Sequence, residues 1–226
     1  MTTKPSVLIR PARADDASDL LYLHQLAAVD PQGLVRQPQE ITLEFIVEGF
    51  LLPCLQSGII LVAELPVEED DNEDEHDCKT KQQRIVGDMH ALNPTSPIAF
   101  QHLLTDVSIA VLPSVQGQGI GRKLFQDFFH RIPTHIARVE LYTLSTNARN
   151  VQFYERMGFV NEGTQTNRIF YYDCDQTDGK AVQEAEEEDE AAAELRTPIH
   201  MAWLNPNFDM KELLLHHKKS LKKHVT

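Results

Sequence analysis

Along the chain, some segments have the apolar pattern typical of strands and others have the pattern typical of helices. Apolar runs of strand length are rich in Val, Ile and Leu, and they predict buried strands at residues 7–12, 59–63, 84–91, 107–112, 136–144 and 198–204. Apolar residues at helical spacing predict helices over 15–29 and 41–56, and further helices after Gly119 and from Asn147. Residues 159–160 and 168–172 are predicted to be extended. This order indicates a mixed α/β domain.

A glycine-rich segment follows the strand predicted at 107–112 and opens the next helix. Its three glycines allow a close backbone approach, and the first N–H groups of a helix form a site suited to phosphate. A nucleoside-triphosphate loop would need a Lys-Ser or Lys-Thr pair after the glycines, which this segment lacks. The dinucleotide fingerprint would need a glycine where Arg122 stands. Residues 116–121 instead fit Gln/Arg-x-x-Gly-x-Gly/Ala at every fixed position.

A second segment, at residues 147–159, reads Asn-Ala-Arg-Asn-Val-Gln-Phe-Tyr-Glu-Arg-Met-Gly-Phe. Asn147 suits a helix N-cap and Gly158 the C-terminal end of a helix. Asn147 and Tyr154 lie seven residues apart, so both project from nearly the same helix face. Together with the glycine turn, this segment resembles the GNAT acetyltransferase superfamily and its pattern Asn-x-x-Ala-x-x-x-Tyr-x-x-x-Gly-Phe. Asn150 stands where Ala is usual.

The resemblance implies a fold of the α/β class with three layers. The expected sheet is GNAT-like, mixed and mostly antiparallel, with six to seven strands, a splay between the fourth and fifth strands and helices on both faces. The domain is expected over residues 6–205, with acidic insertions at about 66–82 and 174–196. A basic tail over residues 206–226 is expected to be helical. The resemblance is sharpest from residue 105 to residue 160.

The resemblance also implies acetyl transfer from acetyl-CoA to a primary amine by direct attack in a ternary complex. Tyr154 matches the general acid that protonates the departing thiolate, and it is expected to contact the cosubstrate as well. Asn147 is expected to hydrogen bond the cosubstrate arm, and no metal is expected. The remaining residues expected to bind acetyl-CoA are Ile109, Ala110 and Val111 for the acyl-pantetheine, and Gln116, Gly117, Gln118, Gly119, Ile120, Gly121 and Arg122 for the diphosphate.

The general base stays open between three residues. Some family members use a Glu six residues before the position of Val111, where this chain has Thr105. Asp106 is adjacent, but strand alternation directs its side chain to the opposite face unless a bulge intervenes. Glu140 on the following strand and His90 on the preceding strand are the other candidates.

The replacement of the usual Glu by Thr105 supports a second hypothesis, a non-catalytic acyl-CoA-binding or partner-binding module on the same fold. Under the first hypothesis the acceptor is a small-molecule amine or a protein amino group. Acidic residues favour a cationic acceptor. The protein is expected to be a monomer or a homodimer.

The net charge of −13 arises from two short tracts. Residues 68–77 hold eight acids and residues 184–194 hold seven, with no Lys or Arg in either, so the remainder carries −13 + 15 = +2. This near-neutral remainder does not suggest a nucleic-acid-binding face. No apolar run reaches membrane-spanning length, the N-terminus lacks an apolar signal region, and the three cysteines form no recognisable pattern. These features predict a cytoplasmic protein without a membrane span.

Overall fold

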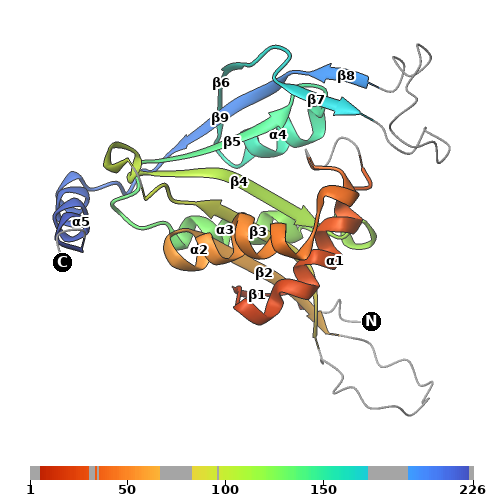
Figure 1. The fold of residues 1–226 in the computed structure, drawn as a ribbon, viewed down its shortest axis with the longest axis horizontal. Coiled ribbons are helices and arrows are strands. Elements are labelled where there is room, and N and C mark those ends of the chain that lie inside the picture. The colour runs from red at the N-terminus through yellow and green to blue at the C-terminus, as the bar shows by residue number, and fades with distance from the viewer. Residues whose placement is uncertain are drawn as a thin grey trace. The chain divides into compact units, whose positions relative to one another are not determined.

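The computed structural model describes residues 6–30, 34, 36–66, 83–95, 97–172 and 193–223. Seven strands hydrogen bond in the order β1-β2-β3-β4-β5-β9-β6, and β7 and β8 form a two-stranded sheet (Figure 1). The chain divides into two compact units, one of Met1–Glu140 with Leu204–Thr226 and one of Leu141–Trp203. Strand β5 begins in the first unit and continues into the second. The mixed α/β fold predicted from the sequence is confirmed.

The strands of the first unit are β1 (Leu8–Pro11), β2 (Ile59–Pro66), β3 (Gln83–Leu92), β4 (Leu103–Val111) and the start of β5 (Arg138–Leu144). Strands β1 to β4 pair antiparallel in chain order, whereas β5 is parallel to β4. The register between β4 and β5 pairs Leu103 with Arg138 and Leu104 with Val139. Within these described strands this pairing is confined to the start of β4.

Helices cover both faces of the first unit's sheet, as adjacent residues of β3 demonstrate. A Cβ at Gly87 would lie 3.5 Å from Ile120, the first residue of α3 (Ile120–Arg131). The next residue, Asp88, instead bonds His24 of α1 (Ala17–Ala27). Successive side chains point to opposite faces, so α1 and α3 lie on opposite sides of β3 (Figure 1). Leu20, Leu23, Leu124, Phe125 and Phe128 are fully buried in the two resulting layers.

The helix predicted over 41–56 is present in two pieces. A π-helical segment, Phe45–Leu51, runs directly into α2 (Leu52–Ser57). Pro53 has no N–H and cannot continue the α-helical hydrogen bonds to Gly49, which explains the wider turns immediately before it. Periodicity alone cannot distinguish these two helical forms over so few residues.

An ion-pair cluster fastens the edge strand β1 to its neighbours. The guanidinium of Arg10 donates to both oxygens of Asp16 at 2.7 and 2.8 Å, and to Glu64 of β2 at 2.9 and 2.5 Å. Asp16 also accepts from the amide of Arg13 at 2.7 Å. Burial would raise the pKa of Asp16, but the Arg10 and Arg13 contacts outweigh burial and hold it below its usual range. Both carboxylates are buried, so the cluster depends on Arg10.

The second unit contains the end of β5, α4 (Ala148–Arg156), β6 (Val160–Thr164), β7 (Ile169–Tyr172), β8 (Ala193–Arg196) and most of β9 (Pro198–Leu204). Strands β6 and β9 pair antiparallel. Strand β8 lies in the segment predicted as an acidic insertion, where Leu195 pairs with Phe170 of β7. Strand β8 depends on this pairing with a distant strand. Its own sequence is too short to show a clear apolar pattern typical of a strand. Most of both predicted insertions, residues 67–82 and 173–192, lies outside the described residues.

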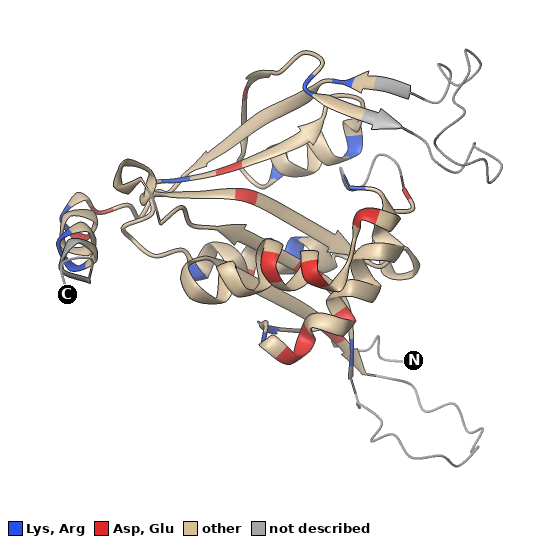
Figure 2. Ribbon diagram, viewed as in Figure 1, with Lys and Arg blue, Asp and Glu red and all other residues tan. Residues whose placement is uncertain are grey.

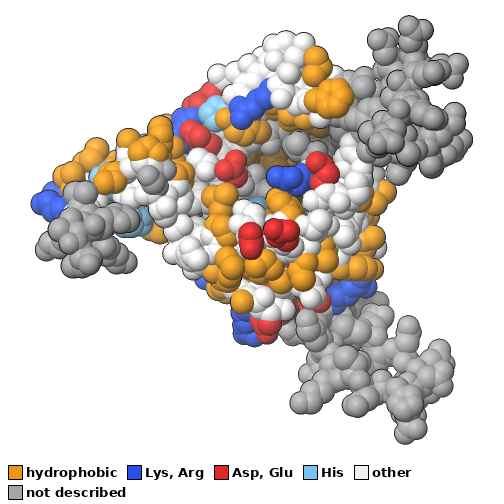
Figure 3. All heavy atoms as spheres, viewed as in Figure 1, with side chains coloured by type: hydrophobic (Ala, Val, Ile, Leu, Met, Phe, Trp, Pro, Cys, Tyr) orange, Lys and Arg blue, Asp and Glu red, His pale blue; other side chains and the backbone are white. Residues whose placement is uncertain are grey.

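The predicted basic tail contains α5 (Met210–Lys223), which belongs to the first unit. Leu213 is buried and the ring of His216 stacks on His135 at 4.0 Å, whereas Met210, Leu214 and Leu215 are exposed. Figure 2 shows basic residues along the described part of α5, and Figure 3 shows hydrophobic side chains beside them. No helix in the described part of the chain is long and apolar enough to cross a membrane.

Candidate active site

The main-chain amides of β4 alternate between its two edges. Leu112, just after the strand, donates its N–H to the carbonyl of Val86 on β3 at 2.9 Å. Because N–H direction alternates along a strand, the amide of Ala110 also points to β3, and those of Ile109 and Val111 point to the opposite edge. At that edge the described part of β4 pairs with β5 through its first two residues. The two amides predicted to hold an acyl-pantetheine therefore point away from β3.

The glycine turn directly follows this strand, after a short 3-10 turn at Pro113–Val115. Gly117 and Gly119 have φ angles of 76° and 84°, which disfavour other residues, and a Cβ at either would meet no atom within 4 Å. Gly119 is the N-cap of α3, and residues 116–119 are exposed. The first amides of α3 therefore begin beside open space, the environment that an anion at a helix start requires.

The turn is tied to β4 by a side chain. Gln116 donates from Nε2 to the carbonyl of Val111 at 3.1 Å. Arg122 in the first turn of α3 is exposed, whereas Ile120 is buried against the sheet. The structure thus brings the predicted segments 109–111 and 116–122 together at one end of β4.

The predicted caps of the second motif are both present. Asn147 is the N-cap of α4, and its side-chain oxygen accepts from the amide of Asn150 at 3.0 Å. Gly158 follows the end of α4 with a φ of 93°, and a Cβ there would approach Trp203 to 3.3 Å. The amide of Phe159 then donates to the main-chain carbonyl of Tyr154. Asn147 is buried, so its side chain has a structural function in addition to any contact with a cosubstrate.

Tyr154 is also buried within the second unit. Its ring lies 5.6 Å from that of Phe153 and 6.0 Å from that of Phe159, both in edge-to-face arrangements. Burial raises the pKa of Tyr154 to about 12. The phenol therefore keeps its proton throughout the neutral range, as a general acid must.

Two of the three candidate bases differ sharply in their surroundings. Glu140 lies 2.5 Å from Arg138, two residues earlier on β5, and is half-buried. Asp106 is exposed and accepts from the hydroxyl of Thr105 at 3.3 Å. Its φ of 52° is left-handed, which is uncommon outside glycine.

A bulge is present in β4 at Asp106. His90 of β3 faces Ser108, but Leu92, two residues later, faces Thr105, so β4 spans three steps against two on β3. Asp106 lies inside this irregularity. Because of this extra residue, Thr105 and Ser108 lie on the same face of the sheet as His90.

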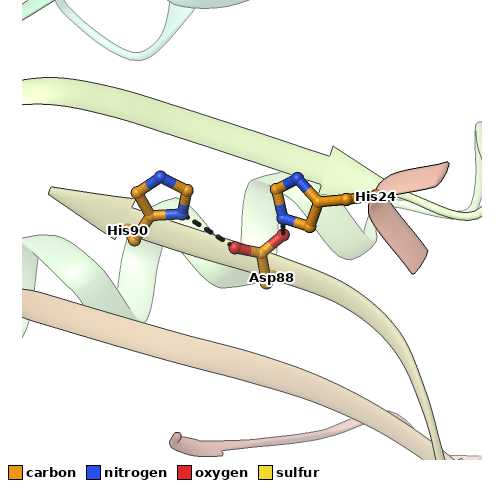
Figure 4. A group of neighbouring side chains, drawn as sticks. All are labelled: His24, Asp88 and His90. Carbon is orange, nitrogen blue, oxygen red and sulfur yellow. Dashed lines mark hydrogen bonds and ion pairs between the residues drawn. The ribbon is translucent and has the colours of Figure 1, made fainter. Parts of the chain in front are cut away.

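The third candidate, His90, belongs to a buried cluster (Figure 4). Its Nδ1 lies 2.9 Å from one oxygen of Asp88, and Nε2 of His24 lies 2.9 Å from the other. Burial would raise the pKa of Asp88, but the charge of His24 and the bonds from both rings outweigh it and hold that pKa well below its usual range.

Neither His24 nor Asp88 was predicted as a site residue from the sequence. Asp88 and His90 lie two residues apart on a predicted strand, so alternation already placed them on one face. His24 lies four residues after Leu20, on the buried side of its helix. The pattern contained these signals separately, but nothing local indicated that helix and strand would meet there.

The fold and these segments define a mixed α/β protein with a glycine turn that follows a partly paired strand. A family model described as the acetyltransferase (GNAT) domain matches residues 73–161. The resemblance to the GNAT superfamily that the motifs indicated is thereby confirmed. No curated protein matches the chain.

Solved structures of acetyltransferases resemble most of the chain. An N-acetyltransferase from Staphylococcus aureus is 16% identical, with a TM-score of 0.61, and the match covers 88% of this chain and 98% of that one. A ribosomal-protein-alanine N-acetyltransferase from Brucella melitensis is 17% identical, with a TM-score of 0.59 and coverage of 87% and 99%. A phosphinothricin acetyltransferase from Sinorhizobium meliloti in complex with AcCoA is 13% identical, with a TM-score of 0.58 and coverage of 89% and 90%. At these identities the likeness establishes the fold.

Proposed function

We propose that the chain is an N-acetyltransferase that moves an acetyl group from acetyl-CoA to a primary amine by direct attack in a ternary complex. The observation that carries this proposal is the exposed glycine turn at the start of α3, next to the outward-facing amides of β4. The GNAT domain match supports it. The Sinorhizobium relative, which has the same fold, was determined with AcCoA.

The turn supplies a binding site for a diphosphate. The first N–H groups of α3 lack intrahelical partners, and the positive end of the helix dipole favours anions. Open space at Gly117 and Gly119 would admit phosphate oxygens close to the backbone. The exposed Arg122 adds a positive charge beside them. This set of groups fits the diphosphate of coenzyme A.

The edge of β4 supplies the second part of the site. The amides of Ile109 and Val111 are proposed to hold the pantetheine and to donate to the thioester carbonyl, with Ala110 between them. A preorganised donor of this kind typically lowers a barrier by about 3 kcal/mol. An activated thioester needs little further chemistry, so positioning the two reactants accounts for most of the acceleration.

Two residues of the second unit complete the proposal by their motif positions. Tyr154 is proposed to give its proton to the departing thiolate, and its pKa of about 12 keeps that proton available. Asn147 is proposed to contact the cosubstrate arm. The acceptor is proposed to be a small-molecule amine or a protein amino group.

The direct test is incubation of the full chain with acetyl-CoA and a panel of alkylamines, polyamines and lysine-containing peptides. Free thiol and the mass of each acceptor are followed together. We expect thiol release to equal the appearance of an acceptor heavier by one acetyl group. Binding of acetyl-CoA without transfer to any acceptor would instead identify a non-catalytic acyl-CoA-binding module, and no binding at all would overturn both functions.

A further inference from the structure

The buried cluster of His24, Asp88 and His90 joins two elements of the first unit. Asp88 and His90 come from β3 and His24 comes from α1. The exposed fractions of these residues are 0% for Asp88, 3% for His24 and 6% for His90. A carboxylate this deeply buried is costly unless each oxygen has a partner, and here each oxygen has one imidazole at 2.9 Å.

Packing holds the two rings in place. Phe50 stacks on His90 with a centroid distance of 4.0 Å and an interplanar angle of 4°, and it lies 5.1 Å from His24. The π-helical segment Phe45–Leu51 brings Phe50 to this position. Side chains locked by both stacking and hydrogen bonds are preorganised, which is a requirement for catalytic groups.

The hydrogen bonds fix which ring nitrogens carry protons. An ionised carboxylate only accepts, so Nε2 of His24 and Nδ1 of His90 must donate to Asp88. In the neutral rings Nδ1 of His24 and Nε2 of His90 are then the basic atoms. Figure 4 shows both of these nitrogens on the side of the rings away from the carboxylate. A proton accepted there produces an imidazolium that already touches a buried negative charge.

The cluster lies next to the strand proposed to hold the acyl group. His90 is directly opposite Ser108 on β4, and antiparallel partners have Cα atoms about 5 Å apart. Ser108 precedes Ile109, whose amide is proposed to hold the pantetheine. His90 is therefore one strand away from the proposed acyl site.

The other charged and titratable groups around His90 do not compete with this role. Strand β2 places Ile60 opposite it, and β4 presents Ser108, with the exposed Asp106 in the bulge beyond. Helix α2 contributes Cys54, whose pKa is raised to about 12 by burial and by the charge of Asp88, so the thiol stays neutral. The counter-charge for a protonated His90 is therefore Asp88.

We propose that His90 is the general base of the acetyl transfer and that Asp88 and His24 are positioning residues that hold its ring and proton in place. This inference rests on the proposed function and selects one of its three candidate bases. Glu140 already lies against Arg138, and Asp106 is exposed in the bulge. His90 alone of the three combines a fixed ring with a buried negative partner.

The acceptor ammonium gives one proton to Nε2 of His90, which later passes it to solvent. The lone pair so released forms a bond from nitrogen to the acetyl carbonyl carbon, the carbon–sulfur bond breaks, and its electron pair leaves with sulfur. The thiolate takes a proton from Tyr154, and the second proton that the nitrogen loses reprotonates Tyr154. The products are an amide, a thiol and one proton.

A divalent cation is the competing occupant of this cluster, because its three ligand atoms lie within 4.8 Å of one another. Two imidazoles and one carboxylate suit zinc in kind. However, each imidazole is paired with a different carboxylate oxygen at hydrogen-bond distance, and this pairing already satisfies Asp88. The geometry therefore favours shared protons, and metal binding becomes an outcome of the test.

The test compares His90→Gln with the wild type, using the primary alkylamine of the panel that is acetylated fastest. Exposed His130 in α3 provides the matched control, His130→Gln. We expect kcat/KM of His90→Gln to fall about 100-fold or more near pH 7, while acetyl-CoA binding stays within twofold. The difference in kcat/KM between His90→Gln and the wild type should shrink as pH rises, because the amine then loses its proton in solution. His24→Gln should give a smaller loss of kcat/KM, because His24 only helps to hold Asp88 in place.

Different results distinguish the possible failures. If His90→Gln keeps the pH profile of the wild type, His90 is not the base, although the transferase stands. If the wild type acetylates no amine, the proposed function fails and the inference fails with it. If dialysis against EDTA abolishes activity and ZnCl2 restores it, the cluster is a metal centre. Should His90→Gln fail to fold, imidazole NMR of the wild type decides: a proton on Nδ1 of neutral His90 supports the proposal, and a proton on Nε2 overturns it.

Discussion

Gln116 donates its side-chain amide to the main-chain carbonyl of Val111 at 3.1 Å, and so links the start of the glycine turn to the end of β4. The bond fixes the distance between the two parts of the proposed coenzyme A site. The amides of β4 would hold the acyl arm and the first amides of α3 the diphosphate. A cosubstrate that spans both parts gains affinity when their spacing is set before it binds.

Replacing Gly119 by Ala should weaken coenzyme A binding. The φ of 84° at this position disfavours a side chain, but a Cβ would meet no protein atom within 4 Å, so the fold should survive. We expect a loss of about 1 kcal/mol in stability and at least a tenfold rise in Kd, because the new methyl group lies beside the proposed diphosphate. Calorimetric titration with coenzyme A measures the second effect.

Gly163 provides the control for this substitution. It also has a positive φ, 146°, and a Cβ there would also meet nothing within 4 Å, but it lies in β6 of the second unit. Gly163→Ala should lower stability and leave the Kd unchanged. Equal weakening of binding by both substitutions would mean that backbone strain, not the diphosphate site, determines affinity.

Replacing Tyr154 by Phe should lower kcat while KM for acetyl-CoA stays nearly constant. The ring contacts with Phe153 and Phe159 remain, so the melting temperature should change little. Since burial raises the pKa of Tyr154 to about 12, its ionisation should not reduce wild-type activity below about pH 10. Steady-state rates from pH 6 to 10 test both statements, and an unchanged kcat in Tyr154→Phe would remove the residue from the mechanism.

Replacing Arg10 by Met should destabilise the first unit by about 3 kcal/mol, because Asp16 and Glu64 would remain buried without their cation. Urea denaturation measures this loss. Arg131→Ala is the control, since Arg131 and Asp127 form an exposed pair one helical turn apart, which is typically worth less than 1 kcal/mol. Similar losses for both variants would show that the Arg10 cluster contributes no more than a surface pair.

Acid should destabilise the protein partly through Asp88. The pKa of this carboxyl is below its ordinary value in the folded protein, so at acidic pH the unfolded chain binds more protons. Its contribution is complete above about pH 4 and is lost as pH falls toward the lowered folded value. The free energy of unfolding should therefore decline less steeply below pH 4 in Asp88→Asn, by up to about 1.4 kcal/mol per pH unit. If the free energy of unfolding declined equally in the wild type and in Asp88→Asn, the pKa of Asp88 would be the same in the folded and the unfolded chain.

Local signals account for the parts of the fold and site that the sequence predicted. Apolar runs marked β2, β3 and β4, and the glycines at 117 and 119 marked the turn into α3. Asn147 and Gly158 are caps whose function depends on their own backbone, so residue type alone was sufficient. In each case the determining interaction lies within a few residues along the chain.

Features that depend on distant partners were not predicted. His24 meets Asp88 because α1 packs on β3, 64 residues away. Strand β8 exists because Leu195 pairs with Phe170 across the chain. The bulge at Asp106 arises from the register of β4 against β3, and period-two alternation contains no sign of such an extra residue. These contacts are properties of tertiary packing.

The structure of the complex with coenzyme A tests the central claim most directly. The account predicts diphosphate oxygens within hydrogen-bond distance of the main-chain amides at residues 117–122, with the pantetheine along the edge of β4 at Ile109 and Val111. Coenzyme A bound elsewhere on the protein, or no binding at saturating concentration, would contradict it.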